Sequence, residues 1–199
     1  MKKIYLISPN KLSKDFYIFF PKVLATRKVK FFQLRCKNYS KKIITKHIKR
    51  ILPITEKYKV KLILNDDAHL ALKFKNVGFH LGQNDLRKSR EIVISNKKQF
   101  FGITCHNSLN LAKKAILLKS SYVAFGAFFS TKTKTVKFVA KKNILQKAKK
   151  LNTKIVAIGG ITNKNYKDLL EYGADFIAIS SFIWKNKQFT PIDAIKLFK

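Results

Sequence analysis

Short apolar runs alternate with amphipathic stretches along the chain. The runs 155–158 (Ile-Val-Ala-Ile) and 176–179 (Phe-Ile-Ala-Ile) are apolar at successive positions, which is typical of parallel strands buried on both faces. The pattern predicts strands at residues 4–7, 29–34, 61–64, 77–80, 100–103, 122–125, 154–158 and 176–179.

Helical periodicity lies between several of these runs. It predicts helices over residues 43–58, 107–120 and 162–172. Asn107 and Thr162 stand at the expected N-caps of the last two helices, because short polar side chains accept hydrogen bonds there. Pro53 should bend or divide the first helix, because proline has no backbone N–H.

Eight strand candidates that alternate with helices indicate an α/β protein. The pattern predicts a compact (β/α)₈ TIM barrel that forms a single domain over residues 1–199. About 200 residues is the lower limit for this fold, so the loops must be short. An open, doubly wound sheet remains an alternative, since the same alternation allows it.

The composition fits a folded cytoplasmic protein. Hydrophobic residues make up 46% of the chain, which is enough for a sizeable core. The two cysteines form no Cys-x-x-Cys pair, so neither a disulfide framework nor a zinc site is indicated. No apolar run approaches the roughly 18 residues of a membrane span, so we expect no membrane partner.

The formal net charge of +33 raises the question of nucleic-acid binding. Only five of the 43 basic residues are arginine, the side chain that favours base and bidentate phosphate contacts. The basic residues are also spread along the chain, as on a solvated surface. We therefore expect no dedicated nucleic-acid partner, although the charge should attract small anions.

Acidic residues give the sharpest chemical clue, because the chain has only ten of them. Asp66 and Asp85 each follow a predicted strand, and these strands are neighbours in the chain. Function in a barrel collects at the carboxyl ends of the strands, so both carboxylates should meet there. Such a pair suits Mg²⁺, which takes one or two carboxylates with phosphate oxygens and water. Alternatively, each aspartate simply caps the helix that follows it.

Other strand ends carry residues that suit anions. Arg35 and Lys37 are two positions apart, so both can point the same way and hold a negative group. Gly160 with Ser180 and Ser181 would suit a phosphate after the seventh and eighth strands, although a tight turn with a serine cap explains them too.

These segments together resemble the thiamine phosphate synthase family, in order, from about residue 30 to residue 184. Residues 33–37 are similar to its Gln-x-Arg-x-Lys motif, 65–66 to Asn-Asp and 80–85 to His-x-Gly-Gln-x-Asp. Further matches are Gly-x-Ser-x-His at 102–107, Thr-x-Thr-Lys at 131–134, apolar-Gly-Gly-Ile at 156–161, and Gly-Ala-Asp with a following Ser at 173–181.

The resemblance implies a Mg²⁺-dependent transferase that joins a pyrimidine diphosphate to thiazole phosphate through a carbocation-like step, releasing pyrophosphate. It implies that the pyrimidine diphosphate binds to Gln33, Arg35, Lys37, Asn65, Thr104 and Lys134. The implied catalytic side chains are Arg35, Lys37, Lys134 and Thr104, and the implied metal ligands are Asp66 and Asp85. It implies that the thiazole phosphate binds to Thr131, Thr133, Gly160, Ser180 and Ser181.

The chain departs from the family pattern at three positions, in or just before two of these segments. Thr104 stands where the family usually has serine, and Ala127 and Ser130 replace prolines before the Thr-x-Thr-Lys motif. His106 keeps a thiazole tautomerase-like activity open as an alternative. A basic nucleic-acid-binding protein on a barrel scaffold and a phosphate binder without turnover are further alternatives, and a homo-oligomer is left open.

Overall fold

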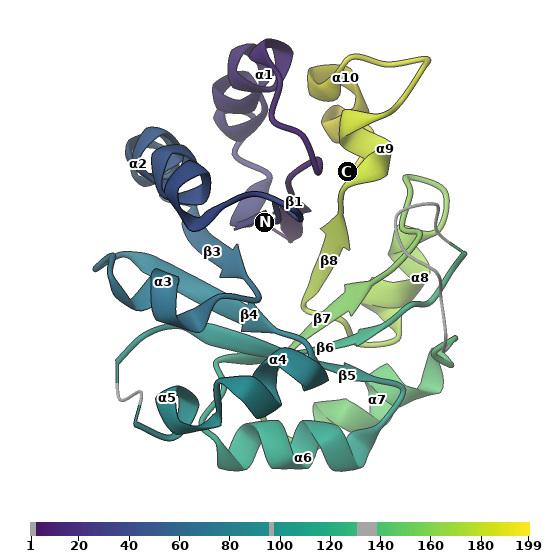
Figure 1. Ribbon diagram of the computed structural model, residues 1–199. Helices are drawn as coiled ribbons and strands as arrows, with labels where there is room; N and C mark the ends of the chain where they lie inside the picture. The colour runs from purple at the N-terminus through teal and green to yellow at the C-terminus, as the bar shows by residue number, and fades with distance from the viewer. Residues whose placement is uncertain (1–2, 96–97, 131–138) are drawn as a thin grey trace.

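The strands close into a barrel in the computed structural model, which describes residues 3–95, 98–130 and 139–199 (Figure 1). The strands are β1 (Ile4–Ile7), β2 (Val29–Leu34), β3 (Lys61–Asn65), β4 (Val77–Leu81), β5 (Phe101–His106), β6 (Tyr122–Gly126), β7 (Lys154–Ile158) and β8 (Phe176–Ile179). Each is parallel to the next, and β1 also pairs with β8. The expected (β/α)₈ barrel is confirmed, and the alternative of an open sheet is wrong.

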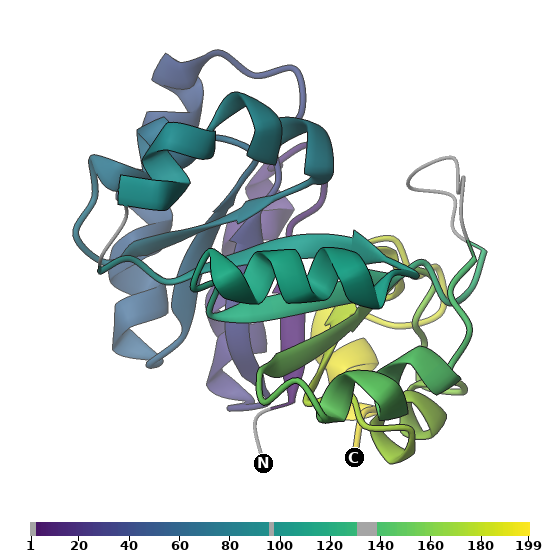
Figure 2. The same cartoon turned by 90° about the horizontal axis from the view of Figure 1, so that it is seen from below.

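The helices form an outer ring around the strands, as Figures 1 and 2 show. They are α1 (Lys14–Ala25), α2 (Lys41–Lys57), α3 (Ala68–Leu72), α4 (Gln83–Lys88), α5 (Arg90–Ser95), α6 (Leu109–Leu117), α7 (Asn143–Lys149), α8 (Tyr166–Glu171), α9 (Ser181–Trp184) and α10 (Pro191–Lys196). The beginning of β1 and the end of the chain lie at the same end of the barrel (Figure 2). In the ranges described, no helix is long and apolar enough to cross a membrane.

Strand side chains alternate between two separate apolar layers. Along β1, Ile4 and Leu6 belong to the larger cluster between the strands and the helices, whereas Tyr5 belongs to the cluster inside the barrel. Both faces of each strand are therefore covered, which is why the strands read as continuous apolar runs.

Aromatic rings fill the interior of the barrel. Tyr122 is fully buried, with its ring centroid 5.5 Å from that of Phe100 and 5.7 Å from that of Tyr5. Its ring lies directly over Gly102 of β5, where an added Cβ would come within 2.0 Å of the tyrosine Cζ. Because glycine has no side chain, Gly102 in β5 leaves room for the ring of Tyr122 from β6.

Two of the expected helix starts are wrong by one or more residues. Ser108 caps α6 by accepting from the N–H of Leu111, so Asn107 is not the cap. Thr162 does not cap α8, because the chain first makes a turn in which its N–H donates to Oδ1 of Asn165. Asn165 then occupies the N-cap position of α8. Several polar residues stand in a row at both places, and local geometry selects one of them.

Pro53 does not divide α2, which was one of the two outcomes expected for it. The helix runs unbroken from Lys41 to Lys57, with Ser40 as its N-cap. Proline removes one intrahelical hydrogen bond, but Ile48 and Ile51 are fully buried against the barrel just before it. Packing of the apolar face of α2 therefore outweighs the tendency of proline to interrupt a helix.

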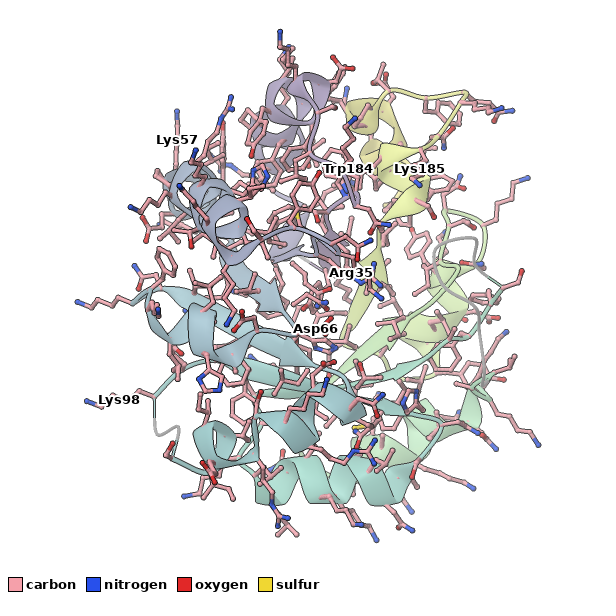
Figure 3. The ribbon with its side chains drawn as sticks, in the orientation of Figure 1. Arg35, Lys57, Asp66, Lys98, Trp184 and Lys185 are labelled. Carbon is pink, nitrogen blue, oxygen red and sulfur yellow. The ribbon has the colours of Figure 1, made fainter. Side chains whose placement is uncertain are left out.

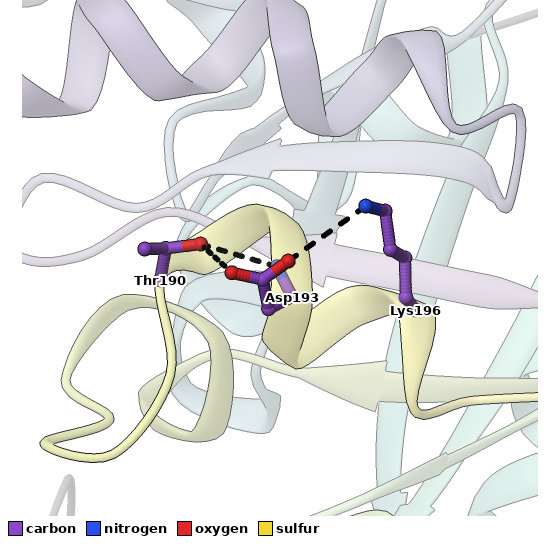
Figure 4. Close-up of polar contacts among 3 residues, drawn as sticks. All are labelled: Thr190, Asp193 and Lys196. Carbon is purple, nitrogen blue, oxygen red and sulfur yellow. Dashed lines mark hydrogen bonds and ion pairs between the residues drawn. The ribbon is translucent and has the colours of Figure 1, made fainter.

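The last helix, α10, shows how the chain fixes a helix end without burial (Figure 4). Thr190 Oγ1 accepts from the N–H of Asp193 at 3.2 Å and donates to its Oδ2 at 2.6 Å. Asp193 also lies 3.7 Å from the Lys196 ammonium, and Pro191 opens the first turn. The threonine cap and the following proline are both sequence signals for this start.

The contact between β5 and Tyr122 predicts a large effect of a single methyl group. Gly102→Ala should lower the free energy of unfolding by about 3 kcal/mol or more, because the tyrosine ring cannot move in a filled barrel. Urea unfolding followed by circular dichroism measures this loss. Gly82→Ala is the control: it has a negative φ and its Cβ would meet only Asp85 Oδ2 at 3.3 Å, so it should cost less than about 1 kcal/mol. Equal losses would contradict the packing argument.

Candidate active site

The carboxyl ends of the strands form one end of the barrel, which we call the mouth. Arg35 and Asp66, just after β2 and β3, lie near the centre of the ring of strands, whereas Lys57 and Lys98 lie at its outer margin (Figure 3). The cation and the carboxylate are close enough for Arg35 to lower the pKa of Asp66. The mouth therefore gathers charged groups of both signs.

Asp66 does not serve as a helix cap. Its neighbour Asp67 caps α3 instead, because Asp67 Oδ1 accepts from the N–H of Leu70 at 2.8 Å. Asp66 itself has a φ of +66°, in the left-handed region, and its N–H donates to the carbonyl of His80 at 2.9 Å. This bond to the end of β4 holds Asp66 in a conformation that few residues adopt freely. The alternative that Asp66 only caps the next helix is wrong.

Asp66 and Asp85 lie together at the mouth. Asp85 stands in the first turn of α4, and Gly82 forms the N-cap with no side-chain bond. Burial and then the Asp85 carboxylate raise the pKa of Asp66 to about 6, while Arg35 and Lys37 pull it down. The structure thus brings together two carboxylates that repel each other and two cations that partly compensate them.

Arg35 is held by residues that follow β1. Its backbone N–H donates to Ser8 Oγ at 2.9 Å, and its Nη1 donates to Asn10 Oδ1 at 3.2 Å. Ser8 is buried, so this bond fixes the direction in which the chain leaves β2. Arg35 also contributes to lowering the pKa of His80. The guanidinium is therefore directed towards the mouth and not into solvent alone.

A chain of hydrogen bonds crosses the barrel just below the mouth. Gln33 Nε2 donates to Tyr5 Oη at 2.9 Å, and Tyr5 Oη lies 2.7 Å from Tyr122 Oη. Tyr122 Oη lies 2.9 Å from His80 Nδ1, and His80 Nε2 lies 2.8 Å from Thr104 Oγ1. Burial, with a smaller effect of the Arg35 cation, lowers the pKa of His80 to about 4, so the ring is neutral at pH 7.

Asn65 in β3 and Thr104 in β5 lie on either side of β4 in the barrel. The carbonyl of Thr104 accepts from Gln83 Nε2 at 2.5 Å, so both its backbone and its hydroxyl are held in place. Asn65 ends β3 opposite His80 in the strand register. Of the residues expected to bind the pyrimidine diphosphate, Gln33, Asn65 and Thr104 thus stand next to the carboxylates and Arg35 or on the hydrogen-bonded chain below them.

The backbone itself requires a glycine at position 160, after β7. Gly160 has a φ of +64°, and a Cβ there would lie 2.4 Å from the carbonyl oxygen of Ser130. Ser180 Oγ donates to the carbonyl of Ser8 at 3.2 Å, and Ser181 opens the short helix α9. These residues lie at the expected strand ends. Ser180 is at the N-cap position, but its side chain makes no cap hydrogen bond.

Three expected site residues, Thr131, Thr133 and Lys134, lie outside the described residues. Neither cysteine is well exposed, since Cys105 is buried and Cys36 is partly buried. Burial raises the pKa of Cys36 to about 11 and that of Cys105 to about 12. Both remain thiols at neutral pH, which makes them poor nucleophiles.

Sequence reasoning missed four residues of this region. Ser8 and Asn10 directly follow β1, a position that the barrel rule points to but that carries no recognisable motif here. Tyr5 and Tyr122 sit inside apolar strands, where their hydroxyl groups are the only hint of a polar role. Residues 117 positions apart meet only once the barrel is closed.

The donor set at the mouth fits magnesium better than zinc. Within residues 3–95, 98–130 and 139–199, no three His, Cys, Asp or Glu side chains group as a metal site. Asp66 and Asp85 offer carboxylate oxygens only, and Mg²⁺ is commonly held by two carboxylates together with phosphate oxygens and water. Burial and then repulsion by Asp85 raise the pKa of Asp66, and a cation between the two carboxylates would relieve that repulsion.

Comparisons with known proteins agree with one another. The family model for thiamine monophosphate synthase matches residues 4–183. A thiamine-phosphate synthase of Pelagibacter ubique (strain HTCC1062) is 50% identical over 205 residues, covering 100% of this chain and 96% of that protein. One of Xylella fastidiosa (strain Temecula1) is 33% identical over 98% of this chain and 82% of that protein. The structure titled thiamine phosphate pyrophosphorylase from Pyrococcus furiosus shares the fold, with a TM-score of 0.82, 23% identity and coverage of 99% and 93% of the two chains.

The carboxylate pair predicts a linked titration. In metal-free protein, Asp85→Asn should lower the pKa of Asp66 from about 6 part of the way to its ordinary value of 3.8, because burial still raises it but the repelling charge is gone. Carboxyl NMR in the presence of a chelator measures the shift. Since the folded-state pKa lies above the unfolded one, the free energy of unfolding should fall as pH rises from about 4 to 6, and less so in Asp85→Asn.

Asp67→Asn is the matched control for that titration. It removes the adjacent carboxylate in the sequence but keeps a good N-cap, so the pKa of Asp66 should stay near 6. A pKa of Asp66 that does not respond to Asp85→Asn would show that the two carboxylates do not interact.

Proposed function

Since the chain belongs to the thiamine monophosphate synthase family, we propose that it joins an aminopyrimidine methyl diphosphate to thiazole phosphate, with Mg²⁺, giving thiamine phosphate and pyrophosphate. The chain is a transferase of thiamine biosynthesis. The observation that carries the mechanistic part is the pairing of Asp66 with Asp85 beside Arg35 and Lys37.

The chemistry needs charge stabilisation more than it needs a base. The pyrimidine substrate carries a primary carbon bonded to diphosphate, next to an electron-rich ring. When the C–O bond breaks, negative charge grows on the diphosphate and positive charge spreads into the ring. Arg35 and Lys37, which already lower the pKa of Asp66, would stabilise the departing anion. Lys134 is expected to add to this charge from the segment outside the described residues.

Asp66 and Asp85 are the residues that would hold magnesium. The ion would neutralise charge on the diphosphate and thereby make it a better leaving group. The carboxylates would then be relieved of their mutual repulsion, since each would face a cation. We therefore expect metal and diphosphate to bind together more tightly than either binds alone.

No side-chain nucleophile is required in this reaction. The thiazole nitrogen attacks the methylene carbon as a neutral lone pair, and the bond to diphosphate is the one that breaks. The raised pKa values of Cys36 and Cys105 agree with this, because a protonated thiol attacks poorly.

The second substrate would bind on the other side of the mouth. Gly160, Ser180 and Ser181 would receive the thiazole phosphate, and Thr131 and Thr133 would contact the thiazole. Thr104, in place of the usual serine, keeps a hydroxyl for the pyrimidine diphosphate and bonds to His80 through it. A homo-oligomer and a cytoplasmic location stay predictions.

A coupling assay tests the function directly. Purified protein mixed with both substrates and Mg²⁺ should form equal amounts of thiamine phosphate and pyrophosphate. Arg35→Ala and Asp85→Asn should each reduce kcat/KM by at least about 100-fold, because each removes charge stabilisation from the leaving diphosphate. A chelator should abolish turnover, and added Mg²⁺ should restore it.

Lys57→Ala is the charge-matched control for Arg35→Ala. It also removes one positive charge, from an exposed position on α2, so it should leave kcat/KM within about twofold of the parent. If Lys57→Ala cost as much as Arg35→Ala, the general positive field and not the mouth would be responsible. If Asp85→Asn left activity unchanged, a metal-independent tautomerase-like reaction would be favoured.

A further inference from the structure

The buried chain from Gln33 to Thr104 can carry its hydrogens in only one direction at a time. Each tyrosine hydroxyl has one hydrogen to donate, and a neutral imidazole has one N–H and one accepting nitrogen. Burial raises the pKa of both Tyr5 and Tyr122, so both phenols keep their hydrogens at neutral pH. The group that donates at one end therefore determines the direction of every hydrogen bond up to the other end.

The Gln33 amide sets this direction. Its Nε2 is a donor, so Tyr5 Oη accepts from it and passes its own hydrogen to Tyr122. Tyr122 then donates to His80 Nδ1, which leaves the imidazole hydrogen on Nε2. That Nε2–H donates to Thr104 Oγ1, and the hydrogen of the threonine hydroxyl is left to point elsewhere.

If the hydrogen bonds ran in the opposite direction, Thr104 would face the mouth as an acceptor and not as a donor. With the Gln33 amide turned over, Thr104 would donate to His80 Nε2, and its oxygen would face the mouth only as an acceptor. Diphosphate oxygens accept hydrogen bonds and donate none at neutral pH. A hydroxyl that faces them must donate, which only the first order allows.

We propose that Tyr5, Tyr122 and His80 are positioning residues that fix His80 as its Nε2–H tautomer and hold the Thr104 hydroxyl as a donor to the diphosphate. This inference rests on the proposed function, since the diphosphate is its ligand. The same order leaves Gln33 Oε1, which makes no bond within this hydrogen-bonded chain, as the acceptor at its far end.

The packing of the barrel keeps this chain in one arrangement. Tyr122 lies over Gly102 and its ring plane is within 15° of that of His80. Gln33, Tyr5, Tyr122 and His80 are all buried, so water does not replace their bonds at low cost. Gln83 holds the backbone of Thr104 at the end of the chain.

The tautomer of His80 is the direct test, and it needs no turnover. In a long-range proton–nitrogen NMR spectrum of the protein with isotope-labelled histidine, His80 should show a hydrogen on Nε2 at pH 7, with its signals assigned through His80→Asn. Tyr122→Phe keeps the ring over Gly102 but removes the hydroxyl, so a mixture of both tautomers should appear. Hydrogen on Nδ1 in the parent, or an unchanged Nε2–H tautomer in Tyr122→Phe, overturns the proposal.

Kinetics then separate positioning from mere packing. Tyr122→Phe should lower kcat about tenfold with KM for the pyrimidine diphosphate changed less than about threefold, because the lost donor acts on charge that develops in the reaction. In a Thr104→Val background, which has no hydroxyl to orient, the same Tyr122→Phe change should cost less than about twofold. An equal cost in both backgrounds means that Tyr122 acts by packing and overturns the proposal.

Tyr17→Phe is the matched control variant. It also removes a tyrosine hydroxyl bonded to a histidine Nδ1, that of His47, at 2.5 Å between α1 and α2. It should change neither the His80 tautomer nor kcat. If the parent makes no thiamine phosphate but His80 has the expected tautomer, the proposed function fails while the hydrogen order stands. If product forms but the tautomer is the other one, this inference fails alone.

Discussion

Two neighbouring carboxylates lie at the mouth of this barrel, and burial together with their mutual repulsion raises the pKa of Asp66. The chain has only ten acidic residues against 43 basic ones, yet Asp66 and Asp85 are placed side by side. The backbone of Asp66 takes a left-handed conformation to stay there, and Arg35 and Lys37 offset part of the cost. The arrangement is costly when empty, and it would become favourable if a cation and an anion bound there, as the proposed function requires.

The interior of the barrel supports this site from below. Gly102 makes room for the Tyr122 ring, and that ring carries the hydroxyl that reaches His80. Tyr122 therefore has two roles: its ring fills the interior of the barrel, and its hydroxyl forms a hydrogen bond with His80. His80 in turn bonds to the hydroxyl of Thr104 at the rim, where we propose that substrate binds.

Sequence reasoning found the strands, the barrel and the placement of the paired aspartates, because apolar runs and strand-end positions are local signals. It failed at helix starts, where several polar residues stand close together: Ser108 and not Asn107 caps α6, and Asn165 and not Thr162 occupies the N-cap position of α8. It also missed the meeting of Tyr5 with Tyr122, which are 117 residues apart and have no pattern in common. Such contacts follow from strand register, which the barrel sets as a whole.

The central claim is that the mouth stabilises a departing diphosphate while the pyrimidine ring carries positive charge. Replacing the ring methyl group of the pyrimidine diphosphate by trifluoromethyl withdraws electrons and changes the shape little. We expect the single-turnover rate of thiamine phosphate formation to fall by at least about 100-fold, with binding nearly unchanged. An unchanged rate would contradict the claim, because the C–O bond would then break without charge in the ring.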